Sequence, residues 1–317
     1  EMCIRDRFYI IIFFNTLFLF AQNKNVNVDS LIKISEYQVF KDVKYGDHKR
    51  NSLDIWLANS KEKTPLLIYI HGGGFVGGNK ESAYKKNNFN RFNKLLNNNI
   101  SFATINYRFM NNEDGILSSL NDAKRALQYI KYNHEKFNID KTKIGLMGSS
   151  AGATSSLWIG FNDDMSDNNS DDPIERENTN VICLVGIAAA HSMDLRRWRD
   201  MIDLDQNYLD EISKKYTRGA GLDEGIWGDK TYDEGYLSKI DFFEKMDSSD
   251  PPFFIVNFGK NRKPKNIADF HHNPVHAKVL KQRGDELKIK NVVYAVGIGI
   301  IDPSNIGMVE FILEQLN

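Results

Sequence analysis

The chain has 317 residues, and 41% of them are hydrophobic, which is enough to bury one sizeable core or two small ones. Its formal net charge of -1 at pH 7 excludes the strongly basic balance that is typical of nucleic-acid-binding proteins and of proteins drawn to anionic membranes. We therefore expect one domain with an insertion, and a small-molecule partner rather than nucleic acid.

The chain opens with an apolar segment. Residues 4–22, IRDRFYIIIFFNTLFLFAQ, place Arg5 and Arg7 before an apolar run that ends at Ala21. This order is typical of a signal peptide. An uncleaved membrane anchor is the alternative, but the run is shorter than the roughly 20 apolar residues that a spanning helix needs. We expect removal of residues 1–21, export to the periplasm or the medium, and no stable membrane span in residues 22–317.

Apolar runs alternate with amphipathic segments along the rest of the chain. Residues 37–45 and 51–58 predict an antiparallel pair of strands. Further strands are expected at 66–71, 101–107, 143–148, 181–190, 253–259 and 291–297, and helices at 80–98, 117–130, 151–161, 274–288 and 306–316. This alternation predicts an α/β fold with a mostly parallel sheet flanked by helices.

Residues 191–252 break this rhythm. They are rich in Trp, Tyr, Gly and charged residues, and we interpret them as a cap-like insertion over the carboxyl ends of the strands. The strand before them contains Cys183, the single cysteine left once Cys3 is removed with the signal peptide. An internal disulfide is then impossible, and Cys183 is expected to be a core residue rather than a nucleophile.

The first chemical motif is GLMGSSAGAT, in which Gly148, Ser150 and Gly152 form a G-x-S-x-G between a strand and a helix. A serine on so sharp a turn leaves no room for side chains two residues to either side. The helix start also directs backbone amides toward negative charge that develops beside Ser150. The motif predicts a nucleophile; a small-residue turn used for tight packing is the alternative.

The second motif is YIHGGGFVGGNK, which follows the strand that ends near His71. Its glycines free the backbone to turn N–H groups inward, so Gly73 and Gly74 are expected to form an oxyanion hole with the amide of Ala151. The alternative is a flexible loop without a catalytic role. His71 precedes the glycines, and we expect it to anchor the loop rather than act as a base.

These motifs, together with INYR, DAKRALQYI, IDKTKIGLMGSSAG and DPPFFIVNFG, resemble the α/β-hydrolase fold over residues 38–316. The resemblance is to the branch of hormone-sensitive-lipase-like and feruloyl-esterase-like carboxylesterases. It implies that Ser150 is the nucleophile and that Gly73, Gly74 and Ala151 frame the oxyanion hole. One departure is Ser149, because members of the family often have Asp or Gly at that position.

The resemblance also implies where the catalytic acid lies. In this fold the acid follows the next-to-last strand, and residues 260–280 contain Asp269 as their sole carboxylate. Asp269 is therefore the expected acid, with a solvated loop aspartate as the alternative.

The histidine of this fold follows the last strand, but residues 297–305 contain isoleucines and no histidine. A triad is defined by geometry rather than by chain order, so another histidine is expected to serve as base. His272 is the prediction, because Asn273 and Pro274 resemble a helix cap and a first turn that hold it at the end of the sheet. His191, His271 and His276 are the other candidates.

Two groups of residues are alternative candidates for metal sites. His272, His276 and Asp269 are a possible zinc set, but Pro274 separates the two histidines and no glutamate lies between them to act as a base. The acidic residues 162–177 lack the ligand order of an EF-hand and are better explained as a solvated loop. We expect no metal and no cofactor.

Three functions follow from these patterns. The first is a secreted serine carboxylesterase that acts on short acyl or aryl esters, including acetyl or feruloyl groups on plant polysaccharide. The second is a degenerate hydrolase that binds such ligands with little turnover. The third is an interaction module in which exposed aromatic residues of the insertion bind a partner or a sugar; they are Trp198, Trp227, Tyr232 and Tyr236, and core packing is the alternative for them. The first is favoured because a decayed enzyme has no evident physical reason to keep a strained serine turn.

Overall fold

The computed structural model describes residues 37–111, 113–202 and 233–317, with positions 205, 207, 208, 210, 211 and 214 between the last two ranges. The expected signal peptide at 1–21 lies outside these residues. None of the described helices has the length and apolar content that crossing a membrane requires.

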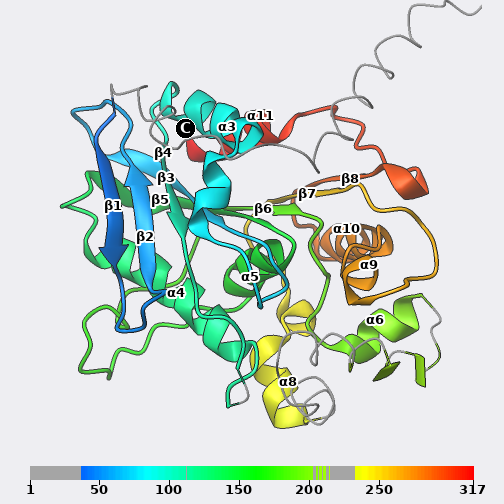
Figure 1. Ribbon diagram of the computed structural model, residues 1–317. Coiled ribbons are helices and arrows are strands. Elements are labelled where there is room, and N and C mark those ends of the chain that lie inside the picture. The colour runs from blue at the N-terminus through cyan, green and yellow to red at the C-terminus, as the bar shows by residue number, and fades with distance from the viewer. Residues whose placement is uncertain are drawn as a thin grey trace, which may run out of the picture.

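A twisted sheet of eight described strands forms the centre of the molecule, in the order β1-β2-β4-β3-β5-β6-β7-β8 (Figure 1). The edge strand β1 is antiparallel to β2, and β2 is antiparallel to β4, whereas the strands from β4 to β8 run parallel. The predicted α/β class is confirmed. The strands are β1 Val39–Lys44, β2 Ser52–Trp56, β3 Thr64–Ile70, β4 Ser101–Ile105, β5 Ile139–Ser149, β6 Cys183–Ile187, β7 Phe253–Asn257 and β8 Asn291–Ala295.

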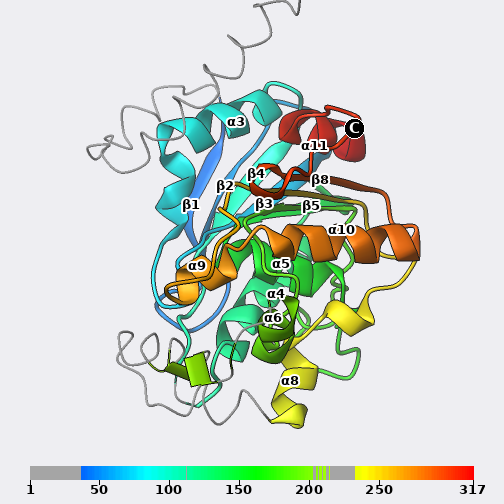
Figure 2. The same ribbon diagram turned by 90° about the vertical axis from the view of Figure 1, so that its right-hand side faces the viewer.

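Helices cover both faces of this sheet (Figure 2). One face carries α3 Lys86–Leu96 and α11 Met308–Leu316, and the other carries α4 Leu117–Tyr132, α5 Ala151–Gly160 and α10 Val275–Leu287. Alternate side chains of the central strands face the two helix layers, as expected for strands that are buried on both sides. The shorter elements are η2 Lys80–Tyr84, α6 Leu195–Met201, α8 Glu234–Ile240, η4 Phe243–Lys245, α9 Ile267–His271 and η5 Val296–Ile298.

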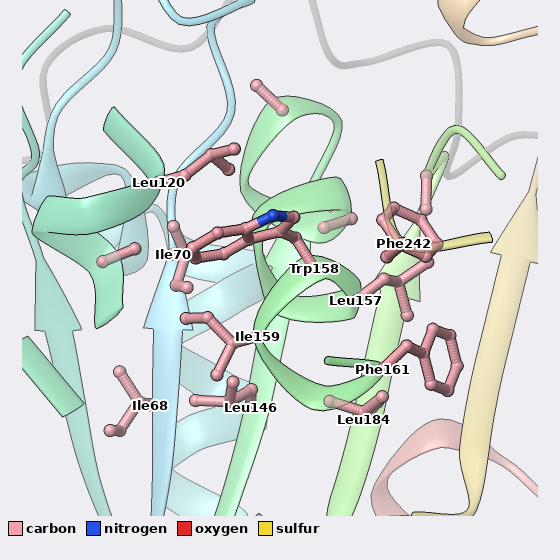
Figure 3. Close-up of a cluster of buried hydrophobic side chains, with 14 of the residues drawn as sticks. Ile68, Ile70, Leu120, Leu146, Leu157, Trp158, Ile159, Phe161, Leu184 and Phe242 are labelled. Carbon is pink, nitrogen blue, oxygen red and sulfur yellow. The ribbon is translucent and has the colours of Figure 1, made fainter. Parts of the chain in front are cut away.

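Helix α5 is buried along its whole length. Figure 3 shows its residues Leu157, Trp158 and Ile159 among side chains from β3, β5 and β6. Its hydroxyl groups, on Thr154, Ser155 and Ser156, donate to backbone carbonyl oxygens one turn earlier in the chain, so the whole helix can lie in the core. Because α5 begins directly after Ser150, this packing fixes the backbone on which the serine sits.

Cys183 lies in the other half of the core, on the face that packs against α3 and α11. Its thiol is free and buried, and burial raises its pKa to about 12. A thiol that stays protonated at neutral pH is a poor nucleophile. The expectation that Cys183 is a core residue is confirmed.

The described parts of the 191–252 insertion pack against the body of the fold. Trp198 of α6 is fully buried, and the hydroxyl of Tyr236 in α8 accepts a hydrogen bond from the backbone N–H of Ile116 at 2.9 Å. The interaction module requires these two aromatic residues to be exposed, but both belong to the core, which was the alternative for them. Trp227 and Tyr232 lie outside the described residues, and a cap-like role for the insertion stays a prediction.

Candidate active site

The serine turn lies between β5 and α5. Ser150 has φ 53° and ψ -123°, a backbone conformation that costs free energy in any residue with a side chain. A Cβ on Gly152 would lie 2.1 Å from the carbonyl oxygen of Ile70, and a Cβ on Gly148 would lie 2.2 Å from the backbone of Gly152. The spacing of the G-x-S-x-G motif therefore has the steric cause expected from the sequence.

The glycine loop crosses directly over this turn. A Cβ on Gly72 would lie 2.6 Å from the carbonyl oxygen of Ser149 and 3.2 Å from Cβ of Ser150. The next two glycines have positive φ values, 129° at Gly73 and 61° at Gly74, which side chains disfavour. The loop therefore lies beside the nucleophile turn, while the oxyanion roles of Gly73, Gly74 and Ala151 remain predictions.

His71 contacts both the backbone of this loop and Arg50. Burial lowers its pKa to about 4, so the ring is neutral, and Nδ1 lies 2.7 Å from the carbonyl oxygen of Gly72. A carbonyl only accepts, so Nδ1 carries the proton and Nε2 is an acceptor that faces Arg50 Nη2 at 3.4 Å. Arg50 also donates to the carbonyl oxygen of Gly78 at 3.0 Å. These contacts support the interpretation of His71 as an anchor.

The structure brings His272 to Ser150. The distance between Ser150 Oγ and His272 Nε2 is 2.7 Å. His272 follows the last residue of α9, and α10 begins at Val275 with Pro274 as its N-cap, one residue later than the sequence predicted. Asn273 precedes this N-cap, and its Oδ1 accepts a hydrogen bond from the N–H of Val275 at 3.0 Å.

The protonation state of His272 suits a general base. Burial lowers its pKa below the usual 6.5, and the negative charge of Asp269 offsets part of this effect. The imidazole is therefore neutral at pH 7, with Nε2 free to accept the hydroxyl proton of Ser150. A base within hydrogen-bonding distance of the proton that it takes meets the first geometric requirement for catalysis.

Asp269 lies near His272, but its hydrogen bonds are to Arg262 and Lys265. Its carboxylate accepts hydrogen bonds from Arg262 Nη2 at 3.2 and 3.3 Å and from the N–H of Lys265 at 3.3 Å. Among the described residues, no hydrogen bond joins Asp269 to His272. Asp269 therefore acts on the imidazole through space in this structure, and its role as the catalytic acid stays a prediction.

The loop after β8 folds back on its own strand. Ile300 and Ala295 exchange backbone hydrogen bonds of 2.9 and 3.2 Å, and Gly299 makes the turn at φ 76°. The side chain of Ile301 is 63% exposed. The carboxylate of Asp302 accepts hydrogen bonds from Ser304 Oγ at 2.6 Å and from the N–H of Val293 in β8 at 3.3 Å. This segment is a closed local turn, and the histidine at the serine comes from the loop after β7.

The zinc interpretation of residues 269–276 does not match the geometry. Nε2 of His276 lies 2.9 Å from the carbonyl oxygen of Phe270, whereas Nε2 of His272 meets Ser150. Within the ranges that the structure describes, no three His, Cys, Asp or Glu side chains converge as metal ligands.

Comparisons with known proteins give a family and several relatives for this chain. The BD-FAE family matches residues 53–262, which include the glycine loop and the serine turn and end before His272. Isoprenylcysteine alpha-carbonyl methylesterase ICME of Arabidopsis thaliana is 32% identical over 118 residues, 37% of this chain and 26% of that protein. Bile salt-activated lipase of Homo sapiens is 30% identical over 131 residues, 37% of this chain and 17% of the lipase. The chain thus spans about a quarter or less of these relatives.

Solved structures show the same fold at lower identity. A truncated form of a carbohydrate esterase from gut microbiota superposes with a TM-score of 0.56 at 18% identity, covering 88% of this chain and 96% of that one. Esterase B from Lactobacillus rhamnosis superposes with a TM-score of 0.55 at 14% identity, covering 84% of this chain and 78% of the other.

Proposed function

The chain belongs to the BD-FAE family of α/β-hydrolases, and from this premise we propose that it is a serine carboxylesterase with Ser150 as nucleophile and His272 as general base. The observation that carries the proposal is the 2.7 Å contact between Ser150 Oγ and His272 Nε2 at a strained turn beneath a glycine loop. A nucleophile paired with a neutral base is the arrangement that acyl transfer requires.

The reaction follows from these positions. Ser150 Oγ attacks the carbonyl carbon of the ester while its proton moves to His272 Nε2. The resulting oxyanion receives hydrogen bonds from backbone N–H groups of Gly73, Gly74 and Ala151. Collapse breaks the ester C–O bond, and His272 returns the proton to the departing alcohol. Water then attacks the acyl-serine through the same base, which releases the acid and restores Ser150.

The dependence of kcat/KM on pH is the first prediction of this mechanism. Protonated His272 cannot accept a proton, so kcat/KM should rise with pH through a pKa below 6.5 and level off near neutrality. Asp269→Asn removes the charge that raises this pKa, so the acid limb should move to lower pH, with a reduced plateau.

Asp247→Asn is the matched control, because Asp247 is an exposed carboxylate in the segment before β7. Profiles of kcat/KM between pH 4 and 8 distinguish the outcomes. An acid limb that stays in place in Asp269→Asn, or that moves to higher pH, would remove Asp269 from the catalytic site.

The proposed substrates are short acyl or aryl esters, including acetyl and feruloyl groups on polysaccharide. A carbohydrate esterase among the structural neighbours and a methylesterase among the relatives support this choice of ester class. The proposal also includes export to the periplasm or the medium, because residues 4–22 have the order of a signal peptide.

A panel of esters tests the substrate class. Residues 22–317 should hydrolyse nitrophenyl acetate and acetylated or feruloylated xylan oligosaccharides faster than long-chain esters, and a serine-directed phosphonate should stop each activity. Specific binding of these oligosaccharides without phosphonate-sensitive turnover would instead support the degenerate hydrolase, the second candidate. One observation favours that candidate: among the described residues, no carboxylate is hydrogen-bonded to His272.

A further inference from the structure

A second group of histidines lies buried near the proposed catalytic dyad, Ser150 and His272. His191 follows β6, His271 ends α9, and His276 lies in the first turn of α10. Burial lowers the pKa of each ring, to about 3 for His191 and well below 6.5 for the other two. All three are therefore neutral at pH 7, and the reaction described above uses none of them.

The hydrogen bonds of His276 fix where the protons lie. Its Nε2 is 2.9 Å from the carbonyl oxygen of Phe270, which can only accept, so Nε2 carries the proton. Nδ1 of the neutral ring is then an acceptor. Nδ1 of His191 lies 2.8 Å away, and the backbone N–H of His191 is at 3.3 Å. His191 Nδ1 must therefore be protonated. A single arrangement of protons on these two rings satisfies all three contacts of His276.

This pair links the base to the rest of the fold. Phe270 lies two residues before His272, and His276 holds its carbonyl oxygen from the next helix. On the other side of His272, Asn257 at the end of β7 donates to the carbonyl oxygen of Asn273 at 3.3 Å. The backbone that carries the base is thus held on both flanks.

The same pair is tied to the nucleophile. The N–H of Ala190 donates to Thr154 Oγ1 at 3.1 Å, and Thr154 Oγ1 lies 3.3 Å from the carbonyl oxygen of Ser150. His191 is the next residue after Ala190. A closed circuit of bonds therefore runs from the serine through α5, the end of β6, the histidine pair and α9 back to the Ser150 side chain.

Trp198 packs against Phe270 and His276. The indole of Trp198 meets the ring of Phe270 edge-on at 5.2 Å between centroids and the ring of His276 at 5.0 Å. Such contacts exclude water, and a hydrogen bond in a dry environment is stronger and more costly to leave unmade.

We propose that His191 and His276 are positioning residues, which hold His272 at Ser150 in place of a carboxylate hydrogen-bonded to the base. This proposal rests on the proposed esterase function. In the usual triad the acid orients the imidazole directly. Here the hydrogen-bonded pair orients the backbone that carries the imidazole.

Two substitutions of one residue separate hydrogen bonding from packing. His191→Asn keeps a donor near the position of Nδ1 but loses the ring, and His191→Phe keeps the ring but loses the donor. Because a displacement of about 1 Å in a reacting group can cost on the order of 100-fold in rate, His191→Phe should lower kcat by about 10- to 100-fold, with KM little changed. His191→Asn should lie closer to the wild type than to the Phe variant.

Two controls test whether a loss of kcat comes only from a general loss of folded structure. His134→Phe changes a histidine that follows α4 and contacts the carbonyl oxygen of Lys131, outside the circuit, and should leave kcat unchanged. Rates are taken per phosphonate-titrated site, well below each variant's Tm. Loss of kcat in the Asn variant with retention in the Phe variant would show that packing matters, and would overturn the proposal.

A measurement on the wild-type protein covers the case in which a variant does not fold. The 15N shifts of the ring nitrogens should show His191 protonated at Nδ1 and His276 protonated at Nε2, and the opposite tautomers would overturn the proposal. Failure of the esterase function is seen separately, as turnover that survives Ser150→Ala. If Ser150→Ala is inactive and His191→Phe has the wild-type kcat, this inference alone is wrong.

Discussion

Ser150→Ala is expected to abolish covalent labelling by a serine-directed phosphonate together with the hydrolysis of short nitrophenyl esters. The substitution removes the attacking oxygen while leaving a side chain that fits the φ of 53° no worse than serine does. Loss of the nucleophile in a well-studied serine protease lowers kcat on the order of a million-fold. A comparable loss here would reduce turnover to the background left by the oxyanion donors.

Ser149→Ala is the matched control, because Ser149 is the adjacent residue and lies at the end of β5. It should keep both labelling and turnover. Mass spectrometry of the phosphonate adduct and steady-state rates on nitrophenyl acetate give the two readouts. Equal labelling of wild type and Ser150→Ala would place the nucleophile elsewhere.

His272→Ala is expected to lower kcat on the order of 10³- to 10⁶-fold, with a much smaller change in KM. The cause is that the serine hydroxyl stays protonated once the acceptor 2.7 Å away is gone. Added imidazole should restore part of the rate, because it can occupy the space left by the ring and accept the proton.

His134→Ala serves as the control for this variant, since it removes an imidazole outside the site. An unchanged kcat in His272→Ala would show that the 2.7 Å contact is not catalytic. The same measurement on Ala variants of His191, His271 and His276 would then identify another base or require one that is not a histidine.

The parts of the site that follow from backbone sterics could be predicted from the sequence. Gly148 and Gly152 are required by close backbone approaches at the serine turn, so their spacing predicted the turn itself. The position of His272 at the serine could also be predicted, because no histidine follows β8 and His272 precedes a helix start marked by Pro274.

Interactions between side chains from distant segments could not be predicted in this way. Asp269 was expected beside the imidazole, but the sequence does not show that Arg262 offers it a competing hydrogen bond. The spacing of His272 and His276 suggested metal ligands. The break between α9 and α10 instead turns His276 toward Phe270. Its partner His191 is 85 residues away and meets it only through the order of the strands.

The rate of phosphonate labelling at Ser150, followed by mass spectrometry as a function of pH, tests the dyad most directly. Labelling requires only the nucleophile and its base, so the choice of ester substrate does not affect the result. The structure predicts a single adduct on Ser150, with a rate that rises through a pKa below 6.5 in the wild type. In His272→Ala that titration should disappear along with most of the rate. An adduct on another residue, or a titration that persists without His272, would contradict the account.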